Sequence, residues 1–242
     1  MIPTRLLVVS ATALGLASAA VTATAGSIAG YGVRTGVAAS TIHGDHADAL
    51  GSGARMGFSG SLFCRFSLGR MLSVQPELGW TSKGEQRDLG ITYTPTTGPD
   101  LTPQTLTLSY DRRIDYLEIP VLLRLGFPNG SSFEPYLLGG PGVAFRTGSG
   151  LELQSTSTAI ASGYGHIQRA TIFEGAGTFD DPHYRDVDWS AIAGGGLAWG
   201  RAPLRVVVES RYALGLAGVF ADTDRSVAHN GSWITTLGIE LR

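Results

Sequence analysis

The chain has 242 residues and a formal net charge of −2, and charged residues make up only 16% of it. Without a basic excess we expect no nucleic-acid partner, and the low charged fraction, against roughly 25% in average soluble domains, is unusual for a soluble protein. A single cysteine, Cys64, excludes an intramolecular disulfide, so the fold must obtain its stability elsewhere.

Residues 1–25 have the features of a secretory signal peptide. Arg5 provides a short basic start, an apolar run of about 16 residues follows, and small-residue cleavage sites end at Ala19 and Ala25. The run is short for a membrane-spanning helix, and a buried N-terminal helix is the alternative that the residues leave open. We expect cleavage after Ala25 and an exported chain that forms one domain over residues 26–242.

The rest of the chain shows little helical periodicity and many runs of period two, which indicate strands. Eight such segments, each of about ten to fifteen residues, can be drawn. In chain order they are residues 29–40, 53–66, 71–82, 110–125, 134–147, 186–199, 203–214 and 231–242.

The connections between these segments alternate between long and short. The short ones, rich in turn-forming residues, are 67–70, 126–132 and 200–202; the long ones are 41–52, 83–109, 148–185 and 215–230. This asymmetry is typical of a transmembrane barrel with short periplasmic turns and longer outer loops. We therefore predict an all-β fold, an eight-stranded antiparallel up-and-down transmembrane β-barrel. The longest loop, 148–185, is the predicted place for partner contacts.

Each predicted strand has one apolar and one mixed polar face, and period two alone fits two kinds of barrel. A soluble, lipocalin-like barrel turns its apolar face inward, whereas a membrane barrel turns it toward lipid. The polar faces lack lysine and carry arginine and glutamate with small glycine and serine between them, which favours a narrow lumen where charges pair. The predicted lumen network comprises Arg34, Arg65, Glu77, Glu118, Arg124, Arg205, Glu209, Arg211 and Glu240.

The tryptophans fit the same orientation. Trp189 and Trp199 share the parity of the outward face and are ten residues apart, which is about 33 Å along a strand. Tilted by about 45°, that length projects to roughly 23 Å, close to the apolar band of about 25 Å between the aromatic girdles of an outer-membrane barrel. We predict that both belong to such girdles, together with Trp80 and Trp233.

Three segments resemble the PorT-type outer-membrane β-barrel family, often described simply as porin-family proteins. They contain the runs Gln-Pro-Glu at 75–77, Tyr-Leu-Glu-Ile-Pro-Val-Leu-Leu at 116–123, and residues 135–142. The resemblance covers residues 29–242 and implies an outer-membrane barrel, but no particular activity. In that family, prolines such as Pro76, Pro120 and Pro141 are part of the pattern; from the residues alone we expect them at bulges or near a rim.

Motifs for chemistry are lacking, so we predict no enzyme, no cofactor and no metal site. His43, His46, His166, His183 and His229 all lie in predicted long loops. The runs HGDHAD at 43–48 and DDPHYRD at 180–186 contain His and Asp at distances that could hold a metal, but solvated turn residues explain them as well. A lipid-modifying enzyme with a Ser–His pair at the rim is a further alternative, although no partner serine stands out.

The expected function is a structural or surface-interaction role in the outer membrane. Outer-membrane lipid is the expected surrounding, and an extracellular or envelope protein is a candidate partner for the long loops. Because eight strands leave an interior just wide enough for side chains, we expect inward Arg–Glu pairs to close the lumen. A narrow porin-like channel and a soluble lipocalin-like binder are the alternatives.

Overall fold

The computed structural model describes residues 27–43, 53–93, 104–128, 132–159, 178–179, 184–219 and 229–242. Their strands are β1 (Ile28–His43), β2 (Gly53–Ser67), β3 (Leu72–Tyr93), β4 (Gln104–Gly126), β5 (Phe133–Ala159), β6 (Thr178–Phe179), β7 (Val187–Arg201), β8 (Leu204–Gly215) and β9 (His229–Leu241). Within these ranges no helix is both long and apolar enough to cross a membrane.

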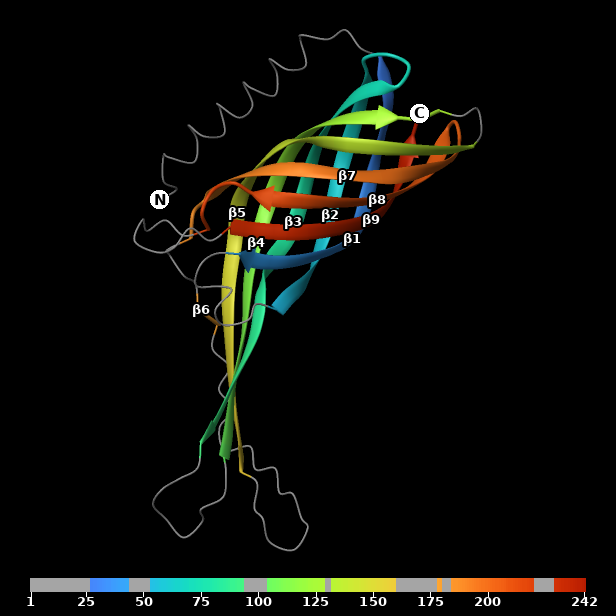
Figure 1. Cartoon of the computed structure of the whole chain (residues 1–242). Coiled ribbons are helices and arrows are strands. Elements are labelled where there is room, and N and C mark those ends of the chain that lie inside the picture. Colours follow the sequence, from blue (N-terminus) through green and yellow to red (C-terminus); the bar gives the residue numbers. More distant parts are fainter. Residues whose placement is uncertain are drawn as a thin grey trace, which may run out of the picture.

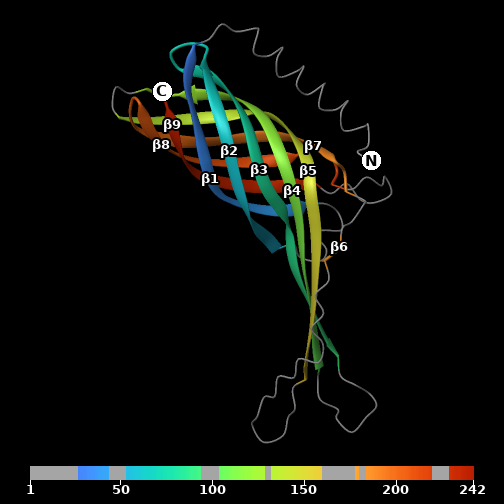
Figure 2. The ribbon, with the colours of Figure 1, turned by 180° about the vertical axis from the view of Figure 1, so that it is seen from behind.

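Eight long strands close into a barrel (Figures 1 and 2). Neighbours in the chain pair antiparallel from β1 to β5, β5 pairs with β7, and the run continues through β8 to β9. The ring closes where β1 pairs with β9, with Val33 opposite Ile239. The two-residue β6 pairs only with β5, at Leu151 and Glu152. The predicted eight-stranded antiparallel barrel is confirmed.

Three strands continue far beyond the barrel wall as a ribbon. β3, β4 and β5 have 22, 23 and 27 residues. β2 stops pairing with β3 at Gln86 and β7 stops pairing with β5 at Phe145, while β3, β4 and β5 stay paired with one another as far as Tyr93, Gln104 and Ala159. In Figure 1 this ribbon projects downward, away from the end that carries the short turns.

The predicted loops 83–109 and 148–185 were therefore wrong in their extent. Much of each is strand: β3 runs past residue 82, β4 starts before 110, β5 runs past 147, and β6 lies within the second loop. The prediction relied on an apolar face repeating every second residue. A ribbon outside the barrel has no such face to bury, so serine, threonine and charged residues fill positions that the pattern assigns to loops.

Burial alternates along the barrel strands with the predicted parity. On β8, Leu204, Val206 and Val208 are exposed, whereas Arg205 and Glu209 are buried inside. A soluble barrel would have the reverse arrangement, so the lipocalin-like alternative does not apply. A continuous apolar outer wall of this kind is stable when lipid covers it.

Inward glycines make room for large inward side chains. A Cβ on Gly196 of β7 would lie 2.4 Å from the hydroxyl oxygen of Tyr136, and one on Gly238 of β9 would lie 2.5 Å from the Cβ of Arg34. Both distances are shorter than any ordinary van der Waals contact, so an added Cβ would clash. The interior of an eight-stranded barrel accepts a large residue only beside a small one.

The prolines occupy strand interiors instead of bulges or rims. Pro76 lies opposite Val121 in the β3–β4 pairing, and three residues further Gly79 lies opposite Glu118, so the register is the same on both sides. Pro120 lies opposite Gly142 in the β4–β5 pairing. The expectation of bulges or rim positions was wrong, because the ladder tolerates a missing donor through a short lapse in pairing.

We predict that Gly196→Ala destabilises the barrel by about 1–3 kcal/mol, the usual cost of overpacking a tight interior, because the new methyl group displaces the Tyr136 phenol. Urea unfolding in lipid vesicles, followed by tryptophan fluorescence, measures this free energy. Gly69→Ala is the control, since a Cβ there meets no atom within 4 Å. Equal stability of the two variants would contradict the packing argument.

Candidate functional site

Four charged residues form a middle cluster across the lumen: Arg34 of β1, Glu77 of β3, and Glu209 and Arg211 of β8. Arg34 donates through Nη1 to Glu209 at 2.5 Å and pairs through Nη2 with Glu77. Arg211 donates to the other oxygen of Glu77 at 2.7 Å. The Tyr136 hydroxyl of β5 donates to Glu209 at 2.9 Å. All four charged side chains are buried. Their ion pairs link β1, β3 and β8, which lie on different sides of the barrel.

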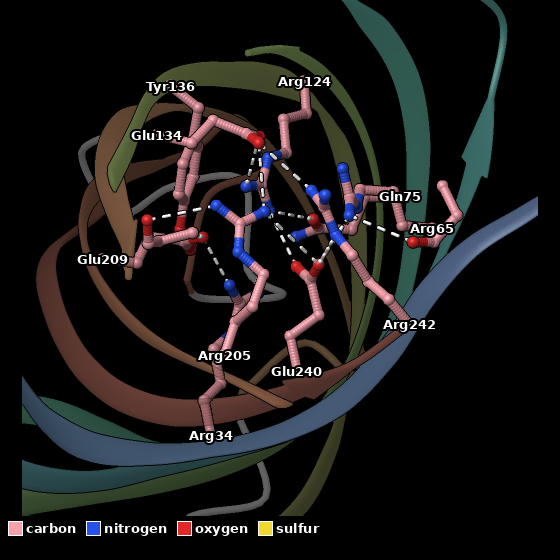
Figure 3. Close-up of polar contacts among 12 residues, drawn as sticks. Arg34, Arg65, Gln75, Arg124, Glu134, Tyr136, Arg205, Glu209, Glu240 and Arg242 are labelled. Carbon is pink, nitrogen blue, oxygen red and sulfur yellow. Dashed lines mark hydrogen bonds and ion pairs between the residues drawn. The ribbon is translucent and has the colours of Figure 1, made fainter. Parts of the chain in front are cut away.

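A second group, the turn-end cluster, lies nearer the short turns and converges in the barrel interior (Figure 3). Its members are Arg65, Arg124, Glu134, Arg205, Glu240 and Arg242. Glu240 accepts from Arg65 at 2.5 Å and from Arg242 at 2.9 Å. Glu134 accepts from Arg205 at 3.0 Å and from Arg242 at 3.1 Å. Two carboxylates thus hold several guanidinium groups together.

A third group, the loop-end cluster, consists of Thr81, Lys83, Tyr116 and Glu118. The ammonium of Lys83 lies 2.5 Å from one oxygen of Glu118, and the Thr81 hydroxyl donates to the other at 3.0 Å. Lys83 also lies over the Tyr116 ring, 5.4 Å from its centroid. Lys83, the single lysine of the chain, falls within the predicted loop 83–109 but is buried in the barrel.

The start of the ribbon repeats this chemistry around Glu85. Its buried carboxylate accepts from Arg87 at 2.9 Å, from Arg112 at 3.2 Å and from the Tyr110 hydroxyl at 3.2 Å. Burial of the phenol, together with the adjacent Glu85 carboxylate, raises the pKa of Tyr110, so the hydroxyl stays protonated and able to donate.

All nine residues assigned to the lumen from sequence are buried, and each belongs to one of the three clusters. The cluster members that the prediction missed include Gln75, Thr81, Lys83, Tyr116, Glu134, Tyr136 and Arg242. Glu134 and Arg242 stood at the ends of predicted strands with inward parity, so alternation alone could have found them. Lys83 was missed because the predicted strand stopped one residue too early.

The four tryptophans lie on the outer wall to different degrees. Trp189 and Trp199 are 56% and 66% exposed and stand near opposite ends of β7. Trp233 is 58% exposed, with its ring 5.2 Å from that of Tyr212. Trp80 is half-buried, and its ring lies 5.9 Å from that of Phe58.

Among the described residues, no group of three or more His, Cys, Asp or Glu could hold a metal ion. His43 and His229 were predicted in loops, but they stand opposite each other where β1 ends and β9 begins. His46, His166 and His183 lie outside the described residues, so the two motifs considered for metal binding are only partly covered.

Comparison with known proteins places the chain among outer-membrane barrels. The family model described as "Outer membrane protein beta-barrel domain" matches residues 24–221. No curated protein matches the sequence.

Solved structures with a similar fold include three bacterial barrels. Neisserial surface protein A, from Neisseria, is 11% identical with a TM-score of 0.41, covering 87% of this chain and 96% of that one. The attachment invasion locus protein Ail of Yersinia pestis is 14% identical with a TM-score of 0.38, covering 88% and 98%. The N-terminal barrel domain of Pseudomonas aeruginosa OprF is 11% identical with a TM-score of 0.29, covering 88% and 98%.

We predict that Glu77→Gln lowers the free energy of unfolding by about 3–5 kcal/mol, since it leaves two buried guanidinium groups with one carboxylate. Asp186→Asn is the matched control. It also removes a carboxylate paired with an arginine, Arg146, but its side chain is 84% exposed, so stability should change little. Urea titration in vesicles measures both. A Glu77 effect as small as the control's would refute the role of the middle cluster.

Proposed function

This chain belongs to the outer membrane protein beta-barrel domain family, and on that premise we propose that it is a non-conducting integral barrel with a structural or surface-interaction role. The observation that carries the proposal is the middle cluster, whose ion pairs cross the lumen from β1 to β3 and β8. A channel of this width would have to pass ions through the space that these side chains occupy.

The energetics of the lumen support closure. The attraction within each buried ion pair offsets the lost hydration of the two charges only while both partners stay in place. Breaking one such pair costs about 3–5 kcal/mol of stability. Clusters above and below the middle cluster add further contacts of the same kind. Eight strands leave no room for a side channel around them. These points favour a plug over the narrow pore that the sequence also allowed.

We assign the outer wall to lipid, with Trp80, Trp189, Trp199 and Trp233 at the two interfaces, where the ring body lies in lipid and the N–H faces water. The short turns face the periplasm and the ribbon of β3–β5 faces outward, as in barrels with short periplasmic connections. Part of the predicted loop 148–185 belongs to this ribbon, so we assign to the ribbon the partner contacts that were expected of that loop. It is the rigid surface for contact with an extracellular or envelope partner.

Three finer assignments belong to the same proposal. Within the family, the runs at 75–77, 116–123 and 135–142 favour the PorT-type group. The barrel performs no catalysis and uses no cofactor. Residues 1–25 act as a cleaved export signal, since a basic start, an apolar run and small residues before Gly26 are what a signal peptidase recognises.

We predict that the wild-type barrel gives no stepwise current in planar lipid bilayers, whereas the paired deletion Glu77→Ala with Arg211→Ala gives conducting steps. The double change removes bulk from the middle cluster without changing net charge. The matched control is Arg146→Ala with Asp186→Ala. It also removes one positive and one negative side chain, but from a pair outside the middle cluster in which Asp186 is 84% exposed. This control should give no current. Steps in the wild type equal to those of the double variant would overturn closure.

We also predict that the protein recovered from outer membranes begins at Gly26. Intact-mass measurement of the detergent-extracted barrel tests this, and Ala25→Arg should slow processing, because a large charged residue does not fit a small-residue cleavage site. A mass that includes residues 1–25, or recovery of the wild type in the aqueous periplasmic extract, would contradict the assignment.

A further inference from the structure

The turn-end cluster carries more positive than negative side-chain charge. Four guanidinium groups, those of Arg65, Arg124, Arg205 and Arg242, share only the two carboxylates of Glu134 and Glu240. The middle cluster, by contrast, has two arginines and two glutamates. The side chains of the turn-end cluster therefore carry two more positive than negative charges in a largely buried place.

Arg124 is the group whose contacts are poorest. Its side chain is 1% exposed, yet its contacts with Glu240, Glu134 and Gln75 measure 3.4, 3.5 and 3.5 Å. These distances are longer than the roughly 2.7–2.9 Å usual for a charge-assisted hydrogen bond. Within the described part of the chain, its Nε and the Nε of Arg65 have no hydrogen-bond partner. The face of the guanidinium rests on the Tyr136 ring instead.

A cavity of about 210 Å³ opens beside this group at the short-turn end. Arg65, Arg124 and Arg242 line it together with Glu134. The rest of the lining comes from residues at and beside the turn between β2 and β3, including Arg70, and from Ala29, Gly126 and Pro128. Donors with unused capacity, an uncompensated charge and an accessible volume thus coincide in one place.

We propose that this cavity binds a phosphate-type oxyanion, with Arg65, Arg124 and Arg242 as its ligands. Inorganic phosphate or a phosphate monoester carries about −1.5 to −2 charge near neutral pH and offers several strong acceptor oxygens, which matches the excess of two positive charges. The planar guanidinium fork donates two parallel hydrogen bonds to such oxygens. The site lies in the space that the barrel encloses, near the short turns, so a free anion reaches it from the turn end. An anion can bind at this site whether or not the lumen conducts.

Isothermal titration of the refolded barrel in neutral detergent with sodium phosphate tests the site, at an ionic strength held constant with sodium chloride. The wild type should show one saturable phosphate site. Arg65→Gln should raise the dissociation constant at least about tenfold, because charge-assisted hydrogen bonds are lost. Arg242→Gln removes a ligand that is 32% exposed, so it tests the same point if Arg65→Gln fails to fold.

Two further variants make the test specific. Arg113→Gln removes an arginine of the ribbon that does not line the cavity, and phosphate binding should stay within about twofold of the wild type, since long-range charge effects are screened by salt. Ser67→Glu puts a carboxylate into the cavity lining and should abolish phosphate binding while raising the thermal stability measured without phosphate. Heat-dependent gel mobility verifies that each variant is folded.

The source of the anion is distinguished in nanodiscs. An anionic lipid headgroup at this site would raise the apparent phosphate dissociation constant in discs containing phosphatidylglycerol relative to purely zwitterionic discs. Equal constants in the two membranes assign the site to free phosphate, as the geometry favours. No phosphate binding beyond the chloride background in the wild type, or equal weakening by Arg113→Gln and Arg65→Gln, would overturn the proposal.

Discussion

The pairing of arginine with glutamate across a narrow interior is the constraint on which this barrel depends. An eight-stranded barrel has no water-filled core in which a charge could be hydrated, so each inward charge needs a partner from another strand. Arg34 of β1 meets Glu77 of β3 and Glu209 of β8. The sizes of the inward-facing residues follow from the same constraint. Tyr136 reaches Glu209 only because Gly196 leaves the space free. Charge complementarity and the alternation of large and small residues are two aspects of one packing problem.

These pairs also fix the register. A one-residue slip of β1 would turn Arg34 out of the lumen and Val33 into it, because successive side chains point to opposite faces of the wall. In a soluble barrel the same slip would turn an outward polar residue into the apolar core and an apolar residue out to water. Here it would put a guanidinium into lipid and leave Glu77 and Glu209 short of a partner inside the barrel, and both are expensive. The ionic interior therefore specifies the fold more strongly than an apolar interior, whose residues could exchange neighbours, would do.

The sequence predicted the wall of the barrel well and its protruding part poorly, for one physical reason. Where a strand separates lipid from lumen, as in β8, the alternation of Val206 and Val208 with Arg205 and Glu209 reveals strand, face and partner chemistry together. Where β3, β4 and β5 leave the barrel, neither face is buried in an apolar medium, and the alternation fades. Lys83 and Glu85 stand at that boundary, which is why the predicted lumen network does not include them. The closeness of Arg124 to Tyr136, at 3.5 Å from the ring centroid, depends on strand stagger and tilt, which no single-strand pattern contains.

Charge is unevenly distributed along the lumen axis, and the unevenness separates binding from conduction. The turn end holds unmatched guanidinium groups beside an open cavity, the middle cluster is balanced, and the loop-end cluster pairs Lys83 with Glu118. Binding an anion requires uncompensated charge and space at one mouth. Conduction requires side chains in the middle that move aside, and paired charges held by several contacts oppose this. As proposed, the barrel attracts an anion to its turn-end mouth and still keeps it from crossing, because the attraction ends where the charges balance.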